Sequence, residues 1–134
     1  MAKPCIYPTL RYADADAAIR WLTDTLGFRD HAVHRAEDGT VAHAELALGP
    51  SIIMLGQARD DAYGAMVGVG RRTDAIYVAV PDADAVFARV EASGVAIEKP
   101  PHDTDYGSRE FACRDPEGNL WSVGTYWPTV ADQI

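Results

Sequence analysis

An internal repeat at about half the chain length constrains the fold of this 134-residue sequence more than any other feature. The stretch from Leu10 to Leu22 matches the stretch from Val78 to Val90 at a constant offset of 68 residues. Self-similarity at a fixed distance indicates that one supersecondary unit is used twice. We therefore expect two copies of one module within a chain long enough for a single compact domain.

Each copy begins with a predicted strand that leads into a predicted helix. The strands are expected at Ile6–Tyr12 and Ala75–Val80, where β-branched and aromatic residues alternate with other types. Asp14 and Asp82 follow the strands at positions where a carboxylate would cap a helix by accepting from free backbone amides. Apolar residues then recur at helical spacing, so both helices should have one face directed to a core.

Each predicted helix ends at a glycine, which suits the left-handed turn that closes many helices. The two glycines are Gly27 and Gly94. Three strand-like stretches follow each helix, separated by turns rich in Gly, Pro, Asp and Asn. In the first half they are Arg29–Arg35, Thr40–Leu48 and Ser51–Gln57, and in the second half Ala96–Lys99, Ser108–Arg114 and Leu120–Thr125.

The element order therefore predicts an α+β fold of two tandem βαβββ modules. Module 1 is expected at about residues 4–58 and module 2 at about residues 74–128. The segment Ala58–Thr73 contains three glycines and no clear periodicity, and is predicted to be the linker between the modules or a flap over a pocket.

The composition excludes several classes of partner. The chain has 12 Lys and Arg against 20 Asp and Glu, so its formal net charge is −8 and should repel nucleic acid and anionic membranes. No apolar run reaches the length of a membrane span, and no secretory leader is recognisable, so the protein is expected in the cytoplasm. Cys5 and Cys113 lack metal-binding spacing and are predicted to be free thiols.

The duplicated order, combined with the turn Asp115-Pro116-Glu117-Gly118-Asn119 before Leu120-Trp121-Ser122, resembles the vicinal oxygen chelate superfamily of glyoxalase I, bleomycin-resistance proteins and extradiol dioxygenases. The resemblance runs from about residue 6 to residue 128. It implies one domain over residues 1–134, with a curved mixed sheet around a cleft. It also implies a homodimer, because two chains of such proteins often complete one cleft.

The resemblance also implies where a divalent metal would be held: by the first and last strands of each module. In this sequence those positions carry Tyr7, Met54, Ala75 and Ser122. None is a conventional ligand for a hard or borderline divalent ion, which prefers imidazole or carboxylate groups. We therefore predict no metal cofactor and no catalytic residues.

Aromatic and polar residues near these positions predict a pocket for a small molecule that is aromatic or cationic. Strand alternation places Thr9 and Arg11 on the same side as Tyr7. The predicted ligand-binding residues are Tyr7, Thr9, Arg11, Met54, Tyr106, Arg109, Trp121, Ser122 and Tyr126.

The preferred hypothesis is a metal-independent binding protein of the glyoxalase/bleomycin-resistance type, which sequesters or recognises its ligand. The alternative is a glyoxalase- or dioxygenase-like metalloenzyme whose divalent metal is held by displaced ligands such as His43, Glu45 and Glu110. His43 and Glu45 are two residues apart on a predicted strand and so share a face. A third hypothesis is a regulatory or self-assembly module with a vestigial cleft.

Overall fold

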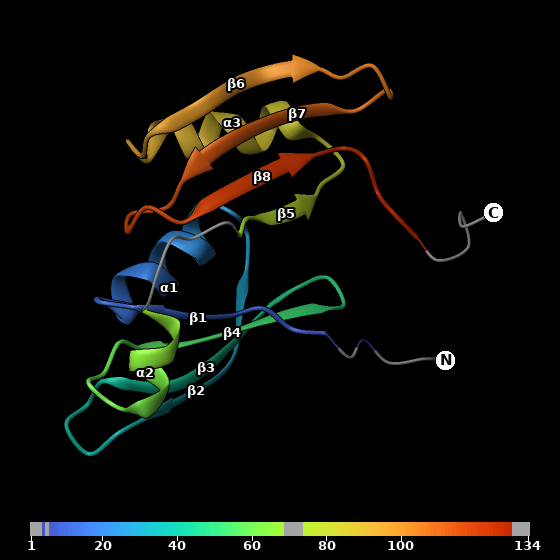
Figure 1. Cartoon of the computed structure of the whole chain (residues 1–134). Helices are drawn as coiled ribbons and strands as arrows, with labels where there is room; N and C mark the ends of the chain where they lie inside the picture. The colour runs from blue at the N-terminus through green and yellow to red at the C-terminus, as the bar shows by residue number, and fades with distance from the viewer. Residues whose placement is uncertain (1–3, 5, 69–73, 130–134) are drawn as a thin grey trace. The chain divides into compact units, whose positions relative to one another are not determined.

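A computed structural model of the chain describes residue 4, residues 6–68 and residues 74–129. The chain divides into two compact units, Met1–Thr73 and Asp74–Ile134, which we call module 1 and module 2. Each contains a four-stranded sheet and a ten-residue helix (Figure 1). The elements of module 1 are β1 (Thr9–Tyr12), α1 (Ala15–Asp24), β2 (Arg29–Arg35), β3 (Val41–Leu48), β4 (Ser51–Gln57) and α2 (Ala62–Val67). Those of module 2 are β5 (Ile76–Ala79), α3 (Ala83–Ala92), β6 (Ile97–Asp103), β7 (Arg109–Arg114) and β8 (Leu120–Gly124).

The two sheets have the same topology. The strand order is β1-β4-β3-β2 in module 1 and β5-β8-β7-β6 in module 2. In each sheet the first strand pairs in parallel with the last, and the remaining neighbours are antiparallel. The predicted βαβββ order is thus confirmed in both halves of the chain.

The predicted helix ends are also confirmed. Oδ1 of Asp14 accepts from the backbone amide of Ala17 at 3.0 Å, and Oδ1 of Asp82 accepts from that of Ala85 at 3.1 Å. The chain leaves α1 through Gly27 with φ +86° and leaves α3 through Gly94 with φ +83°. These left-handed conformations strain residues that have a Cβ atom, which explains glycine at both positions.

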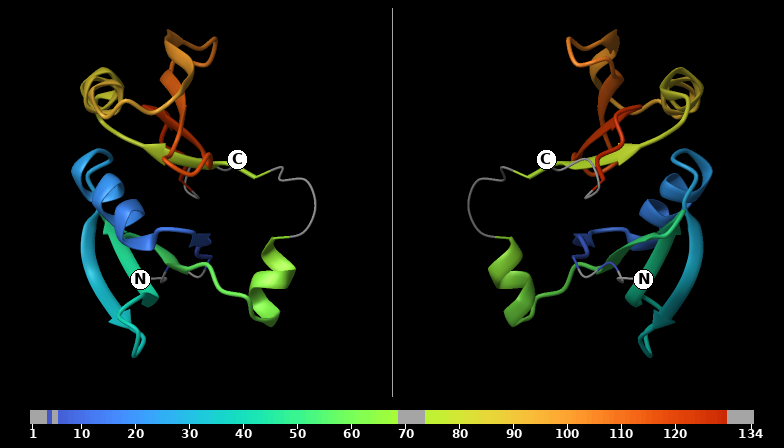
Figure 2. Two further views of the ribbon diagram at one scale, coloured as in Figure 1. Left: turned by 90° about the vertical axis from the view of Figure 1, so that its left-hand side faces the viewer. Right: turned by 90° about the vertical axis from the view of Figure 1, so that its right-hand side faces the viewer.

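Helix α3 covers one face of the module 2 sheet (Figures 1 and 2). Successive side chains of a strand point to opposite faces, so only alternate residues meet the helix. Val78, Phe111 and Trp121 lie on the covered face and are almost completely buried. Their neighbours Tyr77, Glu110 and Ser122 are therefore directed to the opposite face.

Module 1 follows the same rule, with α1 against β1, β3 and β4. Leu10, Leu46 and Leu55 are buried on the α1 side of the sheet. Thr9 and Met54 are register partners on the other side, and Glu45 is paired with Met54 from the neighbouring strand. In both modules the helix thus leaves one sheet face available for polar and aromatic side chains.

The segment Ala58–Thr73, predicted to be a linker or a flap, contains a helix that the sequence analysis did not predict. Residues Ala62–Val67 form the short helix α2, which Asp61 caps by accepting from the Gly64 amide at 2.7 Å. No residue of α2 is buried, so the helix has no apolar face for a periodicity analysis to detect. Residues 69–73 lie outside the described residues.

Strand β6 also differs from its prediction, because it continues past Lys99 through Pro100 and Pro101 to Asp103. Proline cannot donate to a strand ladder and is tolerated mainly at sheet edges and irregularities. Both conditions hold here, since β6 is an edge strand and its pairing with β7 shifts register between Lys99 and His102.

Cys113 is a buried free thiol, in agreement with its prediction, whereas Cys5 lies outside the described residues. Burial raises the pKa of the Cys113 thiol to about 11, and the charge of Asp115 contributes to the rise. A thiol that stays protonated at neutral pH is a poor nucleophile, so Cys113 is a structural residue.

None of the described helices is long and apolar enough to cross a membrane.

The helix caps generate a prediction about stability. Replacing Asp14 or Asp82 by Ala should lower the free energy of unfolding by about 0.5–2 kcal/mol, because a helix amide loses its acceptor. Asp→Asn at the same positions keeps a cap acceptor and is the matched control. Urea unfolding followed by circular dichroism measures the difference. Equal midpoints for the Ala variants and the native chain would show that the caps do not contribute.

Candidate functional site

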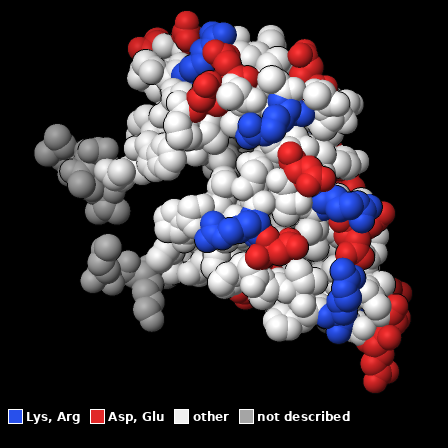
Figure 3. All heavy atoms as spheres, turned by 180° about the vertical axis from the view of Figure 1, so that it is seen from behind, with Lys and Arg blue, Asp and Glu red and all other residues white. Residues whose placement is uncertain are grey.

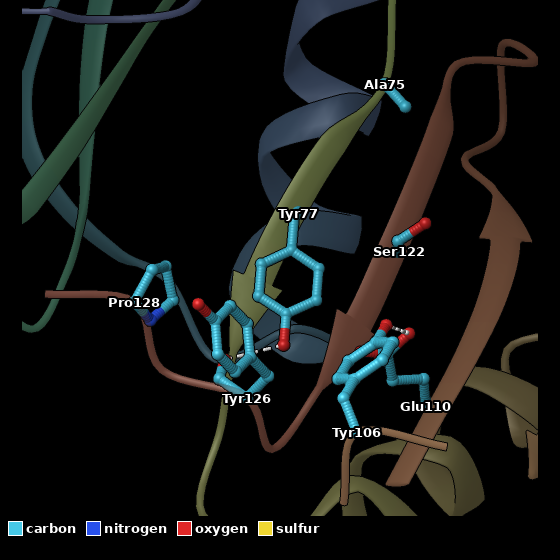
Figure 4. Close-up of a pocket in the computed structure, with 7 residues that line it drawn as sticks. All are labelled: Ala75, Tyr77, Tyr106, Glu110, Ser122, Tyr126 and Pro128. Atoms are coloured by element: carbon cyan, nitrogen blue, oxygen red, sulfur yellow. Dashed lines mark hydrogen bonds between the residues drawn. The ribbon is translucent and has the colours of Figure 1, made fainter. Parts of the chain in front are cut away.

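A pocket of about 320 Å³ opens on the face of the module 2 sheet opposite α3 (Figure 4). The residues that line it come from β5 and the position just before it, from β7 and β8, from the loop before β7 and from the segment after β8. They are Ala75, Tyr77, Tyr106, Glu110, Ser122, Tyr126 and Pro128. Three phenol rings and one carboxylate thus surround a space large enough for a small molecule.

Tyr77 extends from β5 and is fixed at its hydroxyl end. The hydroxyl donates to the backbone carbonyl of Tyr126 at 2.6 Å, which ties the segment after β8 to the edge strand (Figure 4). Burial raises the pKa of Tyr77 above its ordinary value, and the nearby Glu110 carboxylate adds to the rise. Tyr77 therefore stays neutral at physiological pH.

Glu110 supplies the formal charge of the pocket. Its two carboxylate oxygens lie 3.0 and 2.9 Å from the hydroxyl of Tyr106, which donates to them. This hydrogen bond favours the protonated phenol and raises the pKa of Tyr106 above its ordinary value. The Tyr106 ring also meets the Tyr126 ring edge-to-face, with the centroids 5.9 Å apart.

Gly124 allows Glu110 and Tyr77 to lie close together. A Cβ atom at position 124 would lie 2.6 Å from Cγ of Glu110 and 2.7 Å from the Tyr77 hydroxyl oxygen, both shorter than real contacts. The absence of a side chain on β8 at this point thus creates room for the carboxylate and the phenol.

The predicted ligand-binding residues of module 2 are only partly brought together. Tyr106, Ser122 and Tyr126 line the pocket. Trp121 does not, because it faces α3, is fully buried and donates from its indole nitrogen to Asp115 at 3.1 Å. Arg109 also lies on the α3 side of β7, where it forms ion pairs with Asp84 at 3.2 Å and Asp103 at 3.4 Å.

The predicted residues of module 1 lie on or next to the sheet face opposite α1. Thr9 and Arg11 alternate along β1, and Met54 pairs with Thr9. Tyr7 precedes the strand, is 38% exposed and donates its hydroxyl to the Pro4 carbonyl.

Arg11 is engaged by the segment around α2. Its guanidinium lies 4.7 Å from the centre of the Tyr63 ring and 3.6 Å from a carboxylate oxygen of Asp61. One guanidinium nitrogen, Nη1, is buried without a hydrogen-bond partner among the described residues. The charge of Arg11 is thus offset within module 1 by Asp61 and the Tyr63 ring, whereas the hydrogen-bonding capacity of Nη1 is not used among the described residues.

His43 and Glu45 share a face, as their spacing predicts. His43 Nε2 lies 3.1 Å from a carboxylate oxygen of Glu45, and the His43 ring stacks on that of His34. Among the described residues, no group of three or more His, Cys, Asp or Glu side chains is arranged to hold a metal ion.

Tyr77 was missing from the predicted site, although the repeat contains a signal for it. It stands 68 residues after Thr9, which was predicted to face the site. Applying the offset to every site residue would therefore have found it. Glu110 was considered only as a displaced metal ligand, because its bond to Tyr106 depends on a loop whose path the sequence does not specify.

The sequence also matches a known family model. The model of the Glyoxalase/Bleomycin resistance protein/Dioxygenase superfamily matches residues 6–123. The chain belongs to this superfamily. No curated protein gives a significant match.

Solved structures agree with this assignment to the glyoxalase/bleomycin resistance protein/dioxygenase superfamily. TioX from Micromonospora sp. ML1 is 32% identical with a TM-score of 0.75, over 92% of this chain and 100% of that chain. A superfamily enzyme from Burkholderia phytofirmans PsJN is 19% identical, with a TM-score of 0.70 over 88% and 94% of the two chains. The fosfomycin resistance protein FosX from Mesorhizobium loti is 18% identical, with a TM-score of 0.66 over 99% and 98%. The last two likenesses concern the fold alone.

Two of the positions that the superfamily resemblance assigns to a metal lie in the pocket. Ala75 and Ser122 line it, and Tyr77 is the register partner of Ser122. Alanine offers no lone pair and a serine hydroxyl is a weak neutral donor. The pair does not suit a divalent ion, whereas the phenol rings beside it suit an organic ligand.

The Tyr106–Glu110 contact generates a prediction about titration. In the native chain the pKa of Tyr106 should be higher than in the Glu110→Gln variant, because a carboxylate acceptor stabilises the protonated phenol more than an amide does. NMR of tyrosine labelled at the ring carbon that bears the hydroxyl measures this value. Asp105→Asn removes a neighbouring carboxylate that does not contact the hydroxyl, and should leave the pKa of Tyr106 unchanged. An equal effect of both variants would rule out the specific contact.

Proposed function

We propose that this protein binds a small organic molecule without a metal ion, and that it acts by sequestering or recognising this ligand. The observation that carries the proposal is the module 2 pocket, which is lined by three tyrosines and includes two of the superfamily's metal positions. Flat aromatic walls favour an aromatic or cationic guest. Membership of a superfamily that includes bleomycin-resistance proteins supports a ligand of this kind.

The donor set does not fit a divalent metal. The four positions implied by the superfamily carry a phenol, a thioether, a methyl group and a hydroxyl, from Tyr7, Met54, Ala75 and Ser122. Hard and borderline ions bind imidazole and carboxylate groups far better than any of these. We therefore propose that ligand binding does not involve a metal ion, and we propose no catalytic residue.

The His43–Glu45 pair is the observation that favours a metalloenzyme as the second candidate. An imidazole and a carboxylate 3.1 Å apart are suitable ligand types, and both side chains are partly exposed. The imidazole of His43 and the carboxylate of Glu45 already contact each other, so a metal ion would have to replace that contact.

The charge distribution supports a small molecule rather than nucleic acid as the partner. The formal net charge is −8, and on the face shown in Figure 3 basic side chains are interspersed with acidic ones. A phosphate backbone needs a continuous basic surface.

The absence of a metal requirement can be tested directly. After dialysis, elemental analysis should find far less than one transition-metal ion per chain, and aromatic fragments should shift the NMR signals of Tyr77 and Ser122 in the presence of EDTA. Micromolar binding of Zn²⁺, Ni²⁺ or Mn²⁺ that is lost in His43→Ala or Glu45→Ala would support the metalloenzyme instead. Loss of fragment binding on adding EDTA would also contradict the proposal.

A gain-of-function variant is the positive control for this test. Ala75→His combined with Ser122→Glu adds an imidazole and a carboxylate to the pocket that already contains Glu110. The double variant should bind Zn²⁺ at least about tenfold more tightly than the native chain, because the pocket then has ligand types suited to the ion. Failure to bind would mean that these positions cannot direct side chains to a common point.

We also propose that the protein is a homodimer. Each described sheet ends in two edge strands, each with a strand neighbour in its own sheet on one side only, and association of two chains is a common way to cover such edges. Light scattering should give twice the chain mass of 14.5 kDa at micromolar concentration. A mass of one chain under these conditions would contradict the proposal.

A further inference from the structure

Among the described residues, the carboxylate of Glu110 has no cationic partner, although it lies among aromatic rings. Within the described part of module 2, no Lys, Arg or His side chain forms an ion pair with it. The Tyr106 hydroxyl is the one group among the described residues that donates a side-chain hydrogen bond to its carboxylate oxygens. A carboxylate accepts about four hydrogen bonds in full, so Glu110 retains unused acceptor capacity.

The basic residues closest along the sheet do not neutralise Glu110. Arg109 lies on the other face of β7 and pairs with Asp84 and Asp103. His102 is the register partner of Glu110 on β6, but its Nδ1 atom contacts the Pro100 carbonyl at 3.0 Å. The negative charge of the pocket is therefore not compensated by these neighbours.

Further acceptors surround the carboxylate. The hydroxyl of Tyr77 donates to Tyr126 and also bonds the side chain of Ser108, so its oxygen keeps one lone pair for another donor. Ser122 adds a second hydroxyl to the same pocket. A primary ammonium group, with one positive charge and three N–H donors, matches one carboxylate and two neutral oxygens.

The aromatic rings complement the same charge. A cation within about 6 Å of the centre of a phenol ring is attracted to its face, and the attraction grows when water is excluded. Tyr77, Tyr106 and Tyr126 place three such rings around the pocket (Figure 4). Their faces also suit a planar group attached to the ammonium.

We propose that Glu110 anchors the ammonium group of an aromatic amine, with Tyr77, Tyr106 and Tyr126 as the walls of the binding pocket. The inference rests on the proposed function, since it specifies which class of small molecule the pocket binds. Tyr106 satisfies the carboxylate when no ligand is bound. Its hydroxyl needs only to turn its proton away from Glu110 for an ammonium group to take that bond, so the ring remains a wall of the pocket.

A matched pair of probes tests the proposal on the native chain. 2-Phenylethylamine is a cation at neutral pH, whereas 2-phenylethanol has the same ring and chain length without the charge. The amine should bind at least about tenfold more tightly, because charge-assisted hydrogen bonds are roughly twice as strong as neutral ones. NMR titration that follows the amides of Tyr77, Glu110 and Ser122 measures both affinities. Added salt should weaken binding of the amine and leave that of the alcohol unchanged.

The variant Glu110→Gln removes the charge with little change in shape. It should reduce the affinity for the amine to about that for the alcohol, and leave the affinity for the alcohol within about twofold of the native value. Glu91→Gln on α3, on the other side of the sheet, changes the net charge equally and should leave both affinities unchanged. An equal loss of affinity for the amine in the two variants would mean that only the net charge of the protein matters, and would overturn the proposal.

Other outcomes separate this inference from the proposed function. If both probes bind equally at the pocket and Glu110→Gln changes neither, the protein binds small molecules but Glu110 is not an ammonium anchor. If neither probe shifts the pocket residues while other fragments do, the ligand class is wrong and the binding function stands. If no fragment binds the pocket with or without EDTA, both proposals fail.

Discussion

The burial of one face of each sheet under a helix is the constraint on which the rest of this structure depends. Strand side chains alternate, so the burial of Phe111 and Val123 against α3 directs Glu110 and Ser122 to the opposite face. A shift of register by one residue would exchange the two sets and bury a carboxylate. Burying an unpaired charge costs much free energy, so the shifted register is unfavourable. The pocket residues therefore stay on the uncovered face of the sheet.

The buried aspartate at the start of the last turn reinforces this register. Asp115 accepts from the indole nitrogen of Trp121 and from the backbone and side chain of Asn119. These bonds hold Trp121 in the core, and its neighbour Ser122 must then face the pocket. The turn by which the superfamily resemblance was identified therefore also positions a residue of the candidate site.

The sequence predicts those parts of the fold that have a local signal, such as a capping side chain, a glycine at a helix end or an alternating strand pattern. The capping aspartates, the glycines Gly27 and Gly94, and the strands Arg29–Arg35 and Ser51–Gln57 were all identified correctly. Helix α2 was missed because none of its residues is buried. Trp121 was wrongly assigned to the site. An aromatic residue on a strand suits a core or a pocket equally well, and the sequence alone did not show to which face of the sheet its side chain points. Tyr106 and Tyr126 were predicted as site residues from their aromatic character. Both lie outside helices and strands, so sequence periodicity does not predict the contact between their rings.

Duplication has given the two modules the same scaffold, but their uncovered faces differ in how charge is balanced. In module 1, the charge of Arg11 is offset by Asp61 and by the ring of Tyr63, although its Nη1 has no hydrogen-bond partner among the described residues, and His43 is paired with Glu45. In module 2 the residue equivalent to Thr9 is Tyr77, and Gly124 gives it and Glu110 room to approach each other. Within the part of the chain that the structure describes, the charge of Glu110 is offset only by a phenol hydroxyl. A charged group that already has an opposite charge beside it gains little from pairing with a charged ligand, whereas a carboxylate bonded to one exchangeable hydroxyl gains a full ion pair. The difference in charge balance, rather than the shared topology, is the reason to assign ligand binding to module 2.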